Sequence, residues 1–322
     1  MSRRQAGTSL ATRSNPVVSK MAATWTLADL PSQHGRIAVV TGATRGLGFQ
    51  ISEALAASGA TVVMACRDAQ RARDAADAIT ARHPQAQLDV SIPIDLDSLD
   101  SVRRAGAAIA ARYPRIDLLI HNGAAILVPL ATTQDGLERH IGINHYAPFL
   151  LTGLLLPSLQ AAPAARVIGM ASLAHKLTPG LNLDDPLFQR RAYKPMEAYG
   201  SSKLAALLFT DELNRRLQRA GSPVIAATAH PGYSNTNPDT GGFWLRLATR
   251  LFAQPAGDGA LPALYAATAP GVRGGDYIGP GGYKELRGAP KPAQMRPEAR
   301  DAALAARLWA ESERITGCRY LD

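Results

Sequence analysis

The sequence predicts a three-layer α/β fold built on a doubly wound parallel β-sheet of about seven strands. Along most of the 322 residues, short apolar runs alternate with alanine-rich amphipathic stretches, which is typical of a parallel sheet covered by helices on both faces. The first apolar run leads directly into a glycine-rich turn. Hydrophobic residues make up 46% of the chain and charged residues 19%, as expected for a chain that buries a sizeable core.

The apolar runs place the expected strands at 36–41, 61–66, 87–94, 116–121, 165–171, 223–229 and 276–279. Helices are expected at 46–58, 68–82, 97–112, 132–160 and 196–220, with two more after residue 256. This order indicates one Rossmann-type domain over residues 31–322, including a C-terminal extension from about residue 283. Two irregular segments, 173–195 and 231–255, follow the carboxyl ends of strands, where ligands bind in open α/β sheets, so we expect them to form the walls of a substrate pocket.

The first 30 residues are rich in Ser, Thr and Arg and contain no acidic residue before Asp29. Two interpretations are open: a targeting peptide, or a disordered extension with Met21 as the natural start, which we favour. No apolar run reaches the roughly 18 residues that span a bilayer, so we expect no membrane span.

The net charge of +9 raises the question of a nucleic-acid partner. The arginines are scattered in pairs, and no basic run is interleaved with aromatic residues, so we expect no nucleic-acid partner.

Cys66 and Cys318 are the only cysteines, which argues against a disulfide framework and favours a cytoplasmic location. His121 has no second ligand at a suitable spacing, so no metal site is expected.

The glycines of the first turn, Gly42, Gly46 and Gly48, follow the expected strand 36–41. Without side chains there, a diphosphate can approach backbone N–H groups at the positive end of the next helix. The spacing differs from the G-x-G-x-x-G dinucleotide fingerprint. The turn therefore indicates a nucleotide site, with an ordinary strand-to-helix turn as the alternative.

Two arginines favour NADP(H) over NAD(H). Arg67 stands at the end of the second strand, where an NAD site places an acidic residue, and Arg45 lies inside the glycine turn. Both suit a 2′-phosphate, although Asp68 follows directly and both cations could simply face solvent. Asp95, after the third strand, is expected to accept from the adenine amino group. The alternative for Asp95 is a helix N-cap, for which Asp97 is the better candidate.

Tyr199 and Lys203 give the sharpest chemical signal, because positions four apart on a helix share a face. We expect the ammonium to lower the pKa of the phenol toward the range of proton exchange with an alcohol or carbonyl oxygen. Ser172, at the end of the fifth strand, supplies a hydroxyl to hold that oxygen. Asn144 is a polar residue in an apolar helix and faces either the core or the site, while Asn122 is expected to tie neighbouring strands together.

The order of these motifs resembles the short-chain dehydrogenase/reductase family from about Trp25 onward. The motifs are Thr41-Gly42-x-x-x-Gly46-x-Gly48, Asp95, Asn122, Asn144, Ser172, Tyr199-x-x-x-Lys203 and Pro231-Gly232. Within the family, the segments Ser172-Leu-Ala-His, Ser201-Ser-Lys-Leu and His230-Pro-Gly-Tyr are most similar to the retinol-dehydrogenase-like branch. Where the family commonly has Asn-Asn-Ala-Gly, this chain has His121-Asn-Gly-Ala, so we expect altered packing near the adenine.

The resemblance implies roles for particular residues. Tyr199 would be the general acid/base, Lys203 would bind the nicotinamide ribose and tune that tyrosine, Ser172 would position the carbonyl, and Asn144 would help to hold a proton-relay water. The implied cofactor-binding residues are Gly42, Thr44, Arg45, Gly46, Leu47, Gly48, Arg67, Asp95, Leu96, Asn122, Gly123, Tyr199, Lys203, Pro231, Gly232 and Thr236.

The resemblance also implies an NADP(H)-dependent oxidoreductase that interconverts a carbonyl and an alcohol on a fairly lipophilic small molecule. Animal retinol dehydrogenases carry a membrane-anchoring apolar segment that this sequence lacks, so retinoid is not the expected substrate. Alternatives are a double-bond reductase on the same scaffold and a non-catalytic NADPH-binding regulator.

Phe188, Tyr193, Phe243, Trp244 and Leu245 either line the pocket or pack within a lid. A homo-oligomer could form through the helices at 132–160 and 196–220, unless the C-terminal extension covers that face.

Overall fold

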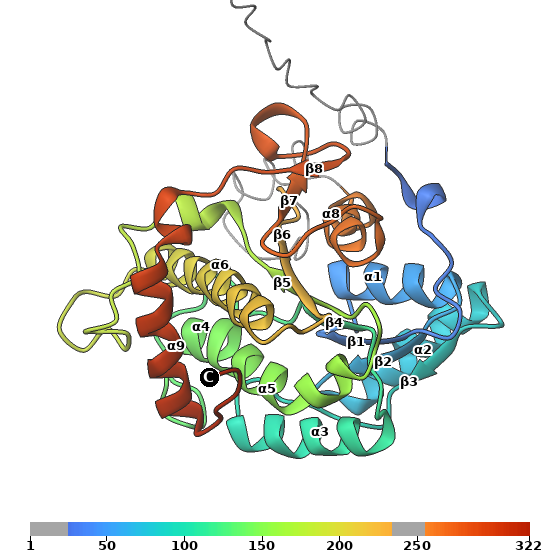
Figure 1. Cartoon of the computed structure of the whole chain (residues 1–322), viewed down its shortest axis with the longest axis horizontal. Coiled ribbons are helices and arrows are strands. Elements are labelled where there is room, and N and C mark those ends of the chain that lie inside the picture. The colour runs from blue at the N-terminus through green and yellow to red at the C-terminus, as the bar shows by residue number, and fades with distance from the viewer. Residues whose placement is uncertain (1–24, 234–254) are drawn as a thin grey trace, which may run out of the picture.

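A mostly parallel β-sheet runs through the centre of the molecule in the computed structural model, which describes residues 25–233 and 255–322 (Figure 1). Over these residues the sheet has eight strands in the order β3-β2-β1-β4-β5-β6-β7-β8. Their bounds are β1 (Ile37–Thr41), β2 (Thr61–Ala65), β3 (Gln87–Asp89), β4 (Leu118–His121), β5 (Arg166–Met170), β6 (Ile225–Ala229), β7 (Tyr277–Pro280) and β8 (Pro290–Pro292). The predicted doubly wound α/β fold is confirmed, with one strand more than expected. That strand, β8, is antiparallel and contains two prolines, a composition that occurs in strands only at sheet edges.

The third strand is shorter than the predicted segment 87–94 and ends at Asp89. The Asp89 carboxylate accepts hydrogen bonds from the backbone and side chain of Ser91, which turns the chain, and Pro93 has no N–H to donate. The chain returns to the sheet at Ile94, whose N–H donates to the Cys66 carbonyl over 3.1 Å. This contact brings Asp95 beside the end of β2.

The helices of the described residues are α1 (Gly46–Ala57), α2 (Ala69–Arg82), α3 (Leu99–Arg112), α4 (Arg139–Ile141), α5 (Ala147–Gln160), α6 (Pro195–Arg219), α8 (Ala256–Thr268) and α9 (Ala302–Thr316). The helix predicted from residue 132 begins only after Glu138. Before it, Gly136 adopts a φ of +76°, and Thr132 pairs with Glu138 in an isolated bridge. Between α4 and α5, Gly142–Tyr146 form a π-helical turn.

Asp97 is not the N-cap of α3, contrary to prediction. The hydroxyl of Ser98 accepts from the N–H of Ser101 and caps this helix. The Asp97 carboxylate instead accepts from the Arg139 guanidinium at 2.9 Å. An acidic residue next to a serine leaves this choice open in the sequence, because both side chains can cap.

Two hydrophobic clusters cover the two faces of the sheet. Val39 and Val63 pack toward α3, α5 and α6, whereas Val40 and Val62 pack toward α1, α2 and α8. Figure 1 shows this arrangement, with α1 and α8 on one side of the sheet and α3, α5 and α6 on the other. Strands buried on both faces explain why the apolar runs in the sequence are continuous rather than alternating.

The C-terminal extension ends in α9, which packs along α6 (Figure 1). Trp309 is 2% exposed, and the guanidinium of Arg216 lies 4.4 Å from the centre of its ring. The extension thus covers part of the α6 surface, and the oligomeric state stays a prediction. Among the helices of the described residues, none combines the length and the apolarity needed to cross a membrane.

Candidate active site

The predicted site residues gather at one edge of the sheet, because the carboxyl ends of parallel strands meet there. Gly42 follows β1, Arg67 follows β2, Asn122 follows β4, Ser172 follows β5 and Pro231 follows β6. Thr236 lies outside the described residues. The edge therefore brings together groups that are far apart in the sequence.

The glycine turn depends on close backbone approach. Gly42 and Gly46 have φ values of +67° and +55°, a region that favours glycine. A Cβ on Gly42 would lie 2.8 Å from the Cα of Gly123, and one on Gly48 would collide with the Gly42 carbonyl and the Asn122 amide. The Asn122 amide donates to the carbonyls of Thr41 and Gly42 over 3.0 and 3.2 Å, which confirms its predicted role in tying the strands.

Helix α1 begins at this turn with Arg45 as its N-cap. Within the described part of the chain, no side chain at this cap accepts from the first amides of the helix. Leu47 is buried beneath the turn, and Thr44 is half-buried. A turn that a Cβ would fill, with backbone N–H groups at a helix N-terminus, fits a bound diphosphate.

Arg67 and Arg45 lie at the surface beside this turn. The Arg67 side chain is 70% exposed, and its guanidinium lies 3.9 Å from the Asp95 carboxylate; Arg45 is also exposed. Asp68 is the acidic residue that kept NAD(H) possible as the cofactor in the sequence. Its carboxylate caps α2 by accepting from the N–H groups of Gln70 and Arg71.

Asp95 and Leu96 adjoin the glycine turn. The Asp95 carboxylate accepts from the Asp97 N–H, and a Cβ on Gly123 would lie 2.8 Å from the Leu96 side chain. Gly123 also donates its N–H to the Thr41 hydroxyl over 3.0 Å. The end of β4 therefore fits closely between the glycine turn and Leu96.

Helix α6 carries Tyr199 and Lys203, which are both buried. The Lys203 ammonium lies 5.8 Å from the centre of the Tyr199 ring and donates to the Met170 carbonyl over 2.8 Å. Two residues beyond Met170, Ser172 caps a short 3₁₀ turn by accepting from the Ala174 N–H. The structure therefore brings Ser172, Tyr199 and Lys203 together, as predicted.

The expected lowering of the Tyr199 pKa is wrong in direction. Burial raises the pKa of Tyr199 above its usual value, and a hydrogen bond with the Ser172 side chain only opposes this. Burial also lowers the pKa of Lys203 to about 8. The ammonium lies over the ring, and its attraction for a phenolate does not offset the loss of water around the hydroxyl.

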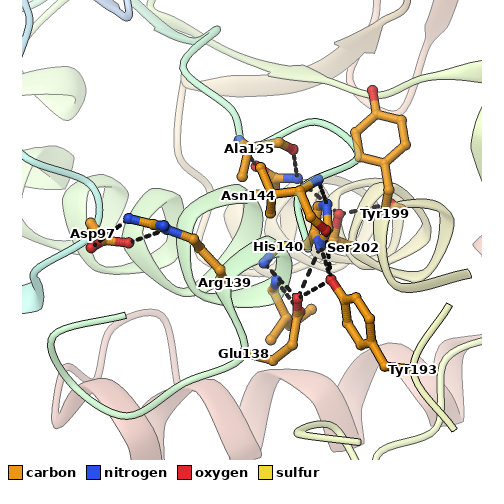
Figure 2. A network of polar contacts seen from close by, with 11 residues as sticks. Asp97, Ala125, Glu138, Arg139, His140, Asn144, Tyr193, Tyr199 and Ser202 are labelled. Atoms are coloured by element: carbon orange, nitrogen blue, oxygen red, sulfur yellow. Dashed lines mark hydrogen bonds and ion pairs between the residues drawn. The ribbon is translucent and has the colours of Figure 1, made fainter. Parts of the chain in front are cut away.

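Asn144 lies in the π-helical turn, and its side chain bonds to the framework of the site (Figure 2). Its carbonyl oxygen accepts from the Ala125 N–H over 2.8 Å, and its amide donates to the Ala125 carbonyl and to the Ser202 hydroxyl, both over 2.9 Å. Ser202 in turn donates to the Tyr199 carbonyl over 2.7 Å. This chain of bonds joins α6 to the segment after β4. The π-helical turn was not predicted, although such turns are frequent at functional sites.

His121 points toward α5 rather than toward the glycine turn. It is buried, and its Nε2 lies 2.8 Å from the Thr152 hydroxyl of α5. Burial lowers the pKa of His121 to about 3, so the ring stays neutral. These contacts give this histidine a packing role.

A cavity of about 670 Å³ adjoins Ser172 and Tyr199. Two short segments, 172–177 and 284–286, line it together with Met196, Gly232 and Tyr233. Of the predicted walls, the start of 173–195 and the start of 231–255 are confirmed, whereas the wall at 284–286 was not predicted. Phe243, Trp244 and Leu245 lie outside the described residues. A second cavity of about 710 Å³, lined by Trp25, Tyr283 and their neighbours, shares no lining residue with this one.

Several polar residues near the site were not predicted. The buried Glu138 and His140 and the half-buried Tyr193 form a cluster beside Tyr199 (Figure 2). Lys176 pairs with Glu285 at 3.0 Å across the cavity. The Asp135-Gly136 pair is a turn signal, and it indicates that the helix begins after it, close to Glu138. Nothing in the local sequence marks Tyr193, because its partners Val128 and Glu138 are distant in the chain.

Comparisons with known proteins extend over most of the chain. The family model described as short chain dehydrogenase matches residues 36–183. The chain is 37% identical over 300 residues to retinol dehydrogenase 13 of Homo sapiens, covering 88% of this chain and 85% of that protein. It is 39% identical over 300 residues to polyprenol dehydrogenase of Mus musculus, covering 89% and 86%. A crystal structure of a protein from Mycobacterium paratuberculosis aligns with a TM-score of 0.76 at 42% identity, over 92% of this chain and 98% of that chain.

Gly48→Ala should destabilise the protein by about 1–3 kcal/mol, because the new methyl group has no space against Gly42 and Asn122. Urea unfolding measures this change. Gly257→Ala in α8 is the matched control, since a Cβ there would make an ordinary contact, 3.4 Å from the Gln50 side chain of α1. Within a helix, alanine is favoured over glycine by about 1 kcal/mol. Equal unfolding midpoints for the two variants would contradict the close approach at Gly48.

Lys203 should make stability rise with pH. Its pKa is about 8 in the folded protein against an ordinary value of 10.5, so between these values the unfolded chain binds more protons. The unfavourable burial of the charge is fully present below pH 8 and disappears as pH rises toward 10.5. The free energy of unfolding of the wild type should therefore rise over this range relative to that of Lys203→Met. Parallel pH curves for the two proteins would rule the shift out.

Proposed function

The chain belongs to the short-chain dehydrogenase family, and we propose that it uses NADP(H), with Tyr199 as general acid/base, to interconvert a carbonyl and an alcohol on a fairly lipophilic small molecule. The relatives described above confirm the predicted resemblance to the retinol-dehydrogenase-like branch. One observation carries the proposal: Ser172 and Tyr199 lie together on a largely apolar cavity, with Lys203 buried behind them.

Tyr199 and Ser172 would handle the substrate oxygen. In reduction the Tyr199 hydroxyl donates its proton to that oxygen, and in oxidation the phenolate takes the proton back. The raised pKa of Tyr199 favours the phenol, which is the form that reduction requires. The Ser172 hydroxyl donates to the same oxygen as charge develops on it. When Lys203 is protonated, its charge stabilises the phenolate that remains on Tyr199.

The nicotinamide cofactor, when bound, supplies or accepts the hydride. We assign the diphosphate to the turn from Gly42 through Thr44, Arg45, Gly46 and Leu47 to Gly48, with Asn122 and Gly123 behind it. Asp95 and Leu96 would hold the adenine. Tyr199 and Lys203 would hold the nicotinamide ribose, and Pro231, Gly232 and Thr236 the nicotinamide. Arg45 and Arg67 support NADP(H), because they stand at the glycine turn and at the end of β2 and guanidinium groups suit bidentate recognition of a phosphate.

The character of the cavity supports a lipophilic substrate. Leu173, Leu177, Met196 and Leu286 line it, and Leu177 is 67% exposed there. The names of the two relatives denote lipophilic alcohols.

We also propose a cytoplasmic location, which the two free thiols of Cys66 and Cys318 support.

Tyr199→Phe should bind NADPH as the wild type does and lose turnover by roughly 10²–10⁴-fold, because only the proton donor is removed. Cofactor binding is measured by titration of NADPH fluorescence, and turnover by nicotinamide absorbance with a panel of apolar aldehydes and alcohols. Undiminished turnover on a confirmed substrate would exclude Tyr199 as the acid/base.

Replacing Arg45 and Arg67 together with glutamine should weaken NADPH binding by roughly 10²- to 10⁴-fold, since charge-assisted hydrogen bonds contribute about 1.5–3 kcal/mol each. NADH binding should change little. Arg104→Gln combined with Arg314→Gln, on the exposed surfaces of α3 and α9, controls for the loss of two positive charges. Equal losses for NADPH and NADH would show that neither arginine distinguishes the 2′-phosphate.

A further inference from the structure

A polar cluster beside Tyr199, formed by the buried Glu138 and His140 and the half-buried Tyr193, has no role in the proposed chemistry (Figure 2). Glu138 is 2% exposed and His140 fully buried. The Glu138 carboxylate accepts from the backbone N–H groups of His140 and Ile141, from Nδ1 of His140 at 2.9 Å and from the Tyr193 hydroxyl at 3.2 Å. Burial opposes ionisation, but the hydrogen bonds from His140 and the backbone outweigh it and lower the pKa of Glu138. The centre of the cluster is therefore a buried carboxylate with a hydrogen-bond donor for each of its two oxygens.

The imidazole of His140 has a defined orientation in this cluster. The Val128 N–H donates to its Nε2 over 3.2 Å, so Nε2 must be the unprotonated nitrogen. Nδ1 then carries the hydrogen and donates to Glu138. The Tyr193 hydroxyl, 3.1 Å from the Val128 carbonyl, completes the contacts with the backbone of that residue.

The segment 125–128 is held at both ends by these groups. Asn144 bonds both backbone groups of Ala125, while His140 and Tyr193 bond the N–H and the carbonyl of Val128. Between them, Leu127 adopts a φ of +50°, a strained conformation for a side chain of this size, which persists only where the surroundings enforce it.

The held segment connects directly to the catalytic helix. Asn144 bonds Ser202, which donates to the Tyr199 carbonyl, and the ring of His140 lies 5.9 Å from that of Tyr199, centre to centre. Figure 2 shows the Tyr199 ring extending away from the cluster, with its hydroxyl at the far end. On its other side, Tyr193 packs edge-on against Phe188 at 5.1 Å, so the cluster also joins Tyr199 to the irregular segment 173–195.

We propose that Glu138, His140 and Tyr193 are positioning residues for Tyr199, a role that rests on the proposed function. They hold the segment 125–128 in place and keep the His140 ring packed against the Tyr199 ring. The phenol therefore keeps its alignment with the substrate oxygen. Small misplacements of a reacting group reduce rates strongly, and the effect should fall on kcat rather than on cofactor affinity.

Tyr193→Phe is the sharpest test, because it removes one hydroxyl and keeps the ring against Phe188. We expect kcat to fall about tenfold with the KM for NADPH unchanged. Tyr113→Phe is the matched control, since its hydroxyl also bonds a carboxylate, that of Asp89 at 2.7 Å, and lies outside the cluster. The two variants should have similar melting temperatures, and only Tyr193→Phe should lose kcat.

Glu138→Gln tests whether the cluster acts as a unit. Combined with Tyr193→Phe, it should lower kcat no further than the more damaging single change, because the two residues share one network. Tyr113→Phe combined with Tyr193→Phe should show independent effects. If Glu138→Gln does not fold, the comparison of Tyr193→Phe with Tyr113→Phe decides alone.

The outcomes separate this inference from the function on which it rests. Turnover lost in Tyr199→Phe but equal in Tyr193→Phe and Tyr113→Phe would overturn the positioning role alone. A multiplicative loss in the Glu138→Gln, Tyr193→Phe double variant would also overturn it. Turnover retained in Tyr199→Phe would overturn the acid/base assignment and the positioning role with it.

Discussion

The parallel pairing of β4 with β1 and β5 is the constraint on which the candidate site depends. Ile120 pairs with Val40 of β1 and with Ile168 of β5. This register places Asn122 against the carbonyls of the glycine turn and sets Ser172 at the same edge. A slip of one residue would turn every side chain of β4 to the opposite face, so the core packing that fixes the register also fixes the site.

Burial shifts the pKa values of two polar groups of the candidate site. Lys203 has a carbonyl partner, that of Met170, yet burial still lowers its pKa to about 8. Tyr199 is likewise shifted toward its neutral form. Both shifts come from removal of water rather than from paired charges. Only Lys203 is brought nearer to proton exchange at neutral pH, at the expense of stability while it is charged, whereas Tyr199 is held as the neutral phenol. The two hydrophobic clusters on the sheet provide the stability that permits this.

The sequence was informative where chemistry is local. The glycine turn, the spacing of Tyr199 and Lys203 on one helix, and the strand ends could all be predicted from neighbouring residues. Contacts between segments that are distant in the sequence could not be predicted. Tyr193 and Glu138 lie 55 residues apart and share no local pattern, and residues 284–286 line the cavity although they belong to the C-terminal extension. The direction of the Tyr199 pKa shift was predicted wrongly for a related reason. The pKa depends on how deeply the hydroxyl is buried, and that burial depends on α6, β5 and the loops packed around them.

The departure at residues 121–124 shows how a motif can change while its framework is kept. Successive residues of a strand point to opposite faces. His121 therefore turns toward Thr152 on α5, whereas Asn122 turns toward the glycine turn and α1. The histidine alters only the side of the sheet that faces α5. Gly123 is the more consequential replacement, because its missing side chain lets Gly42 and Leu96 approach closely.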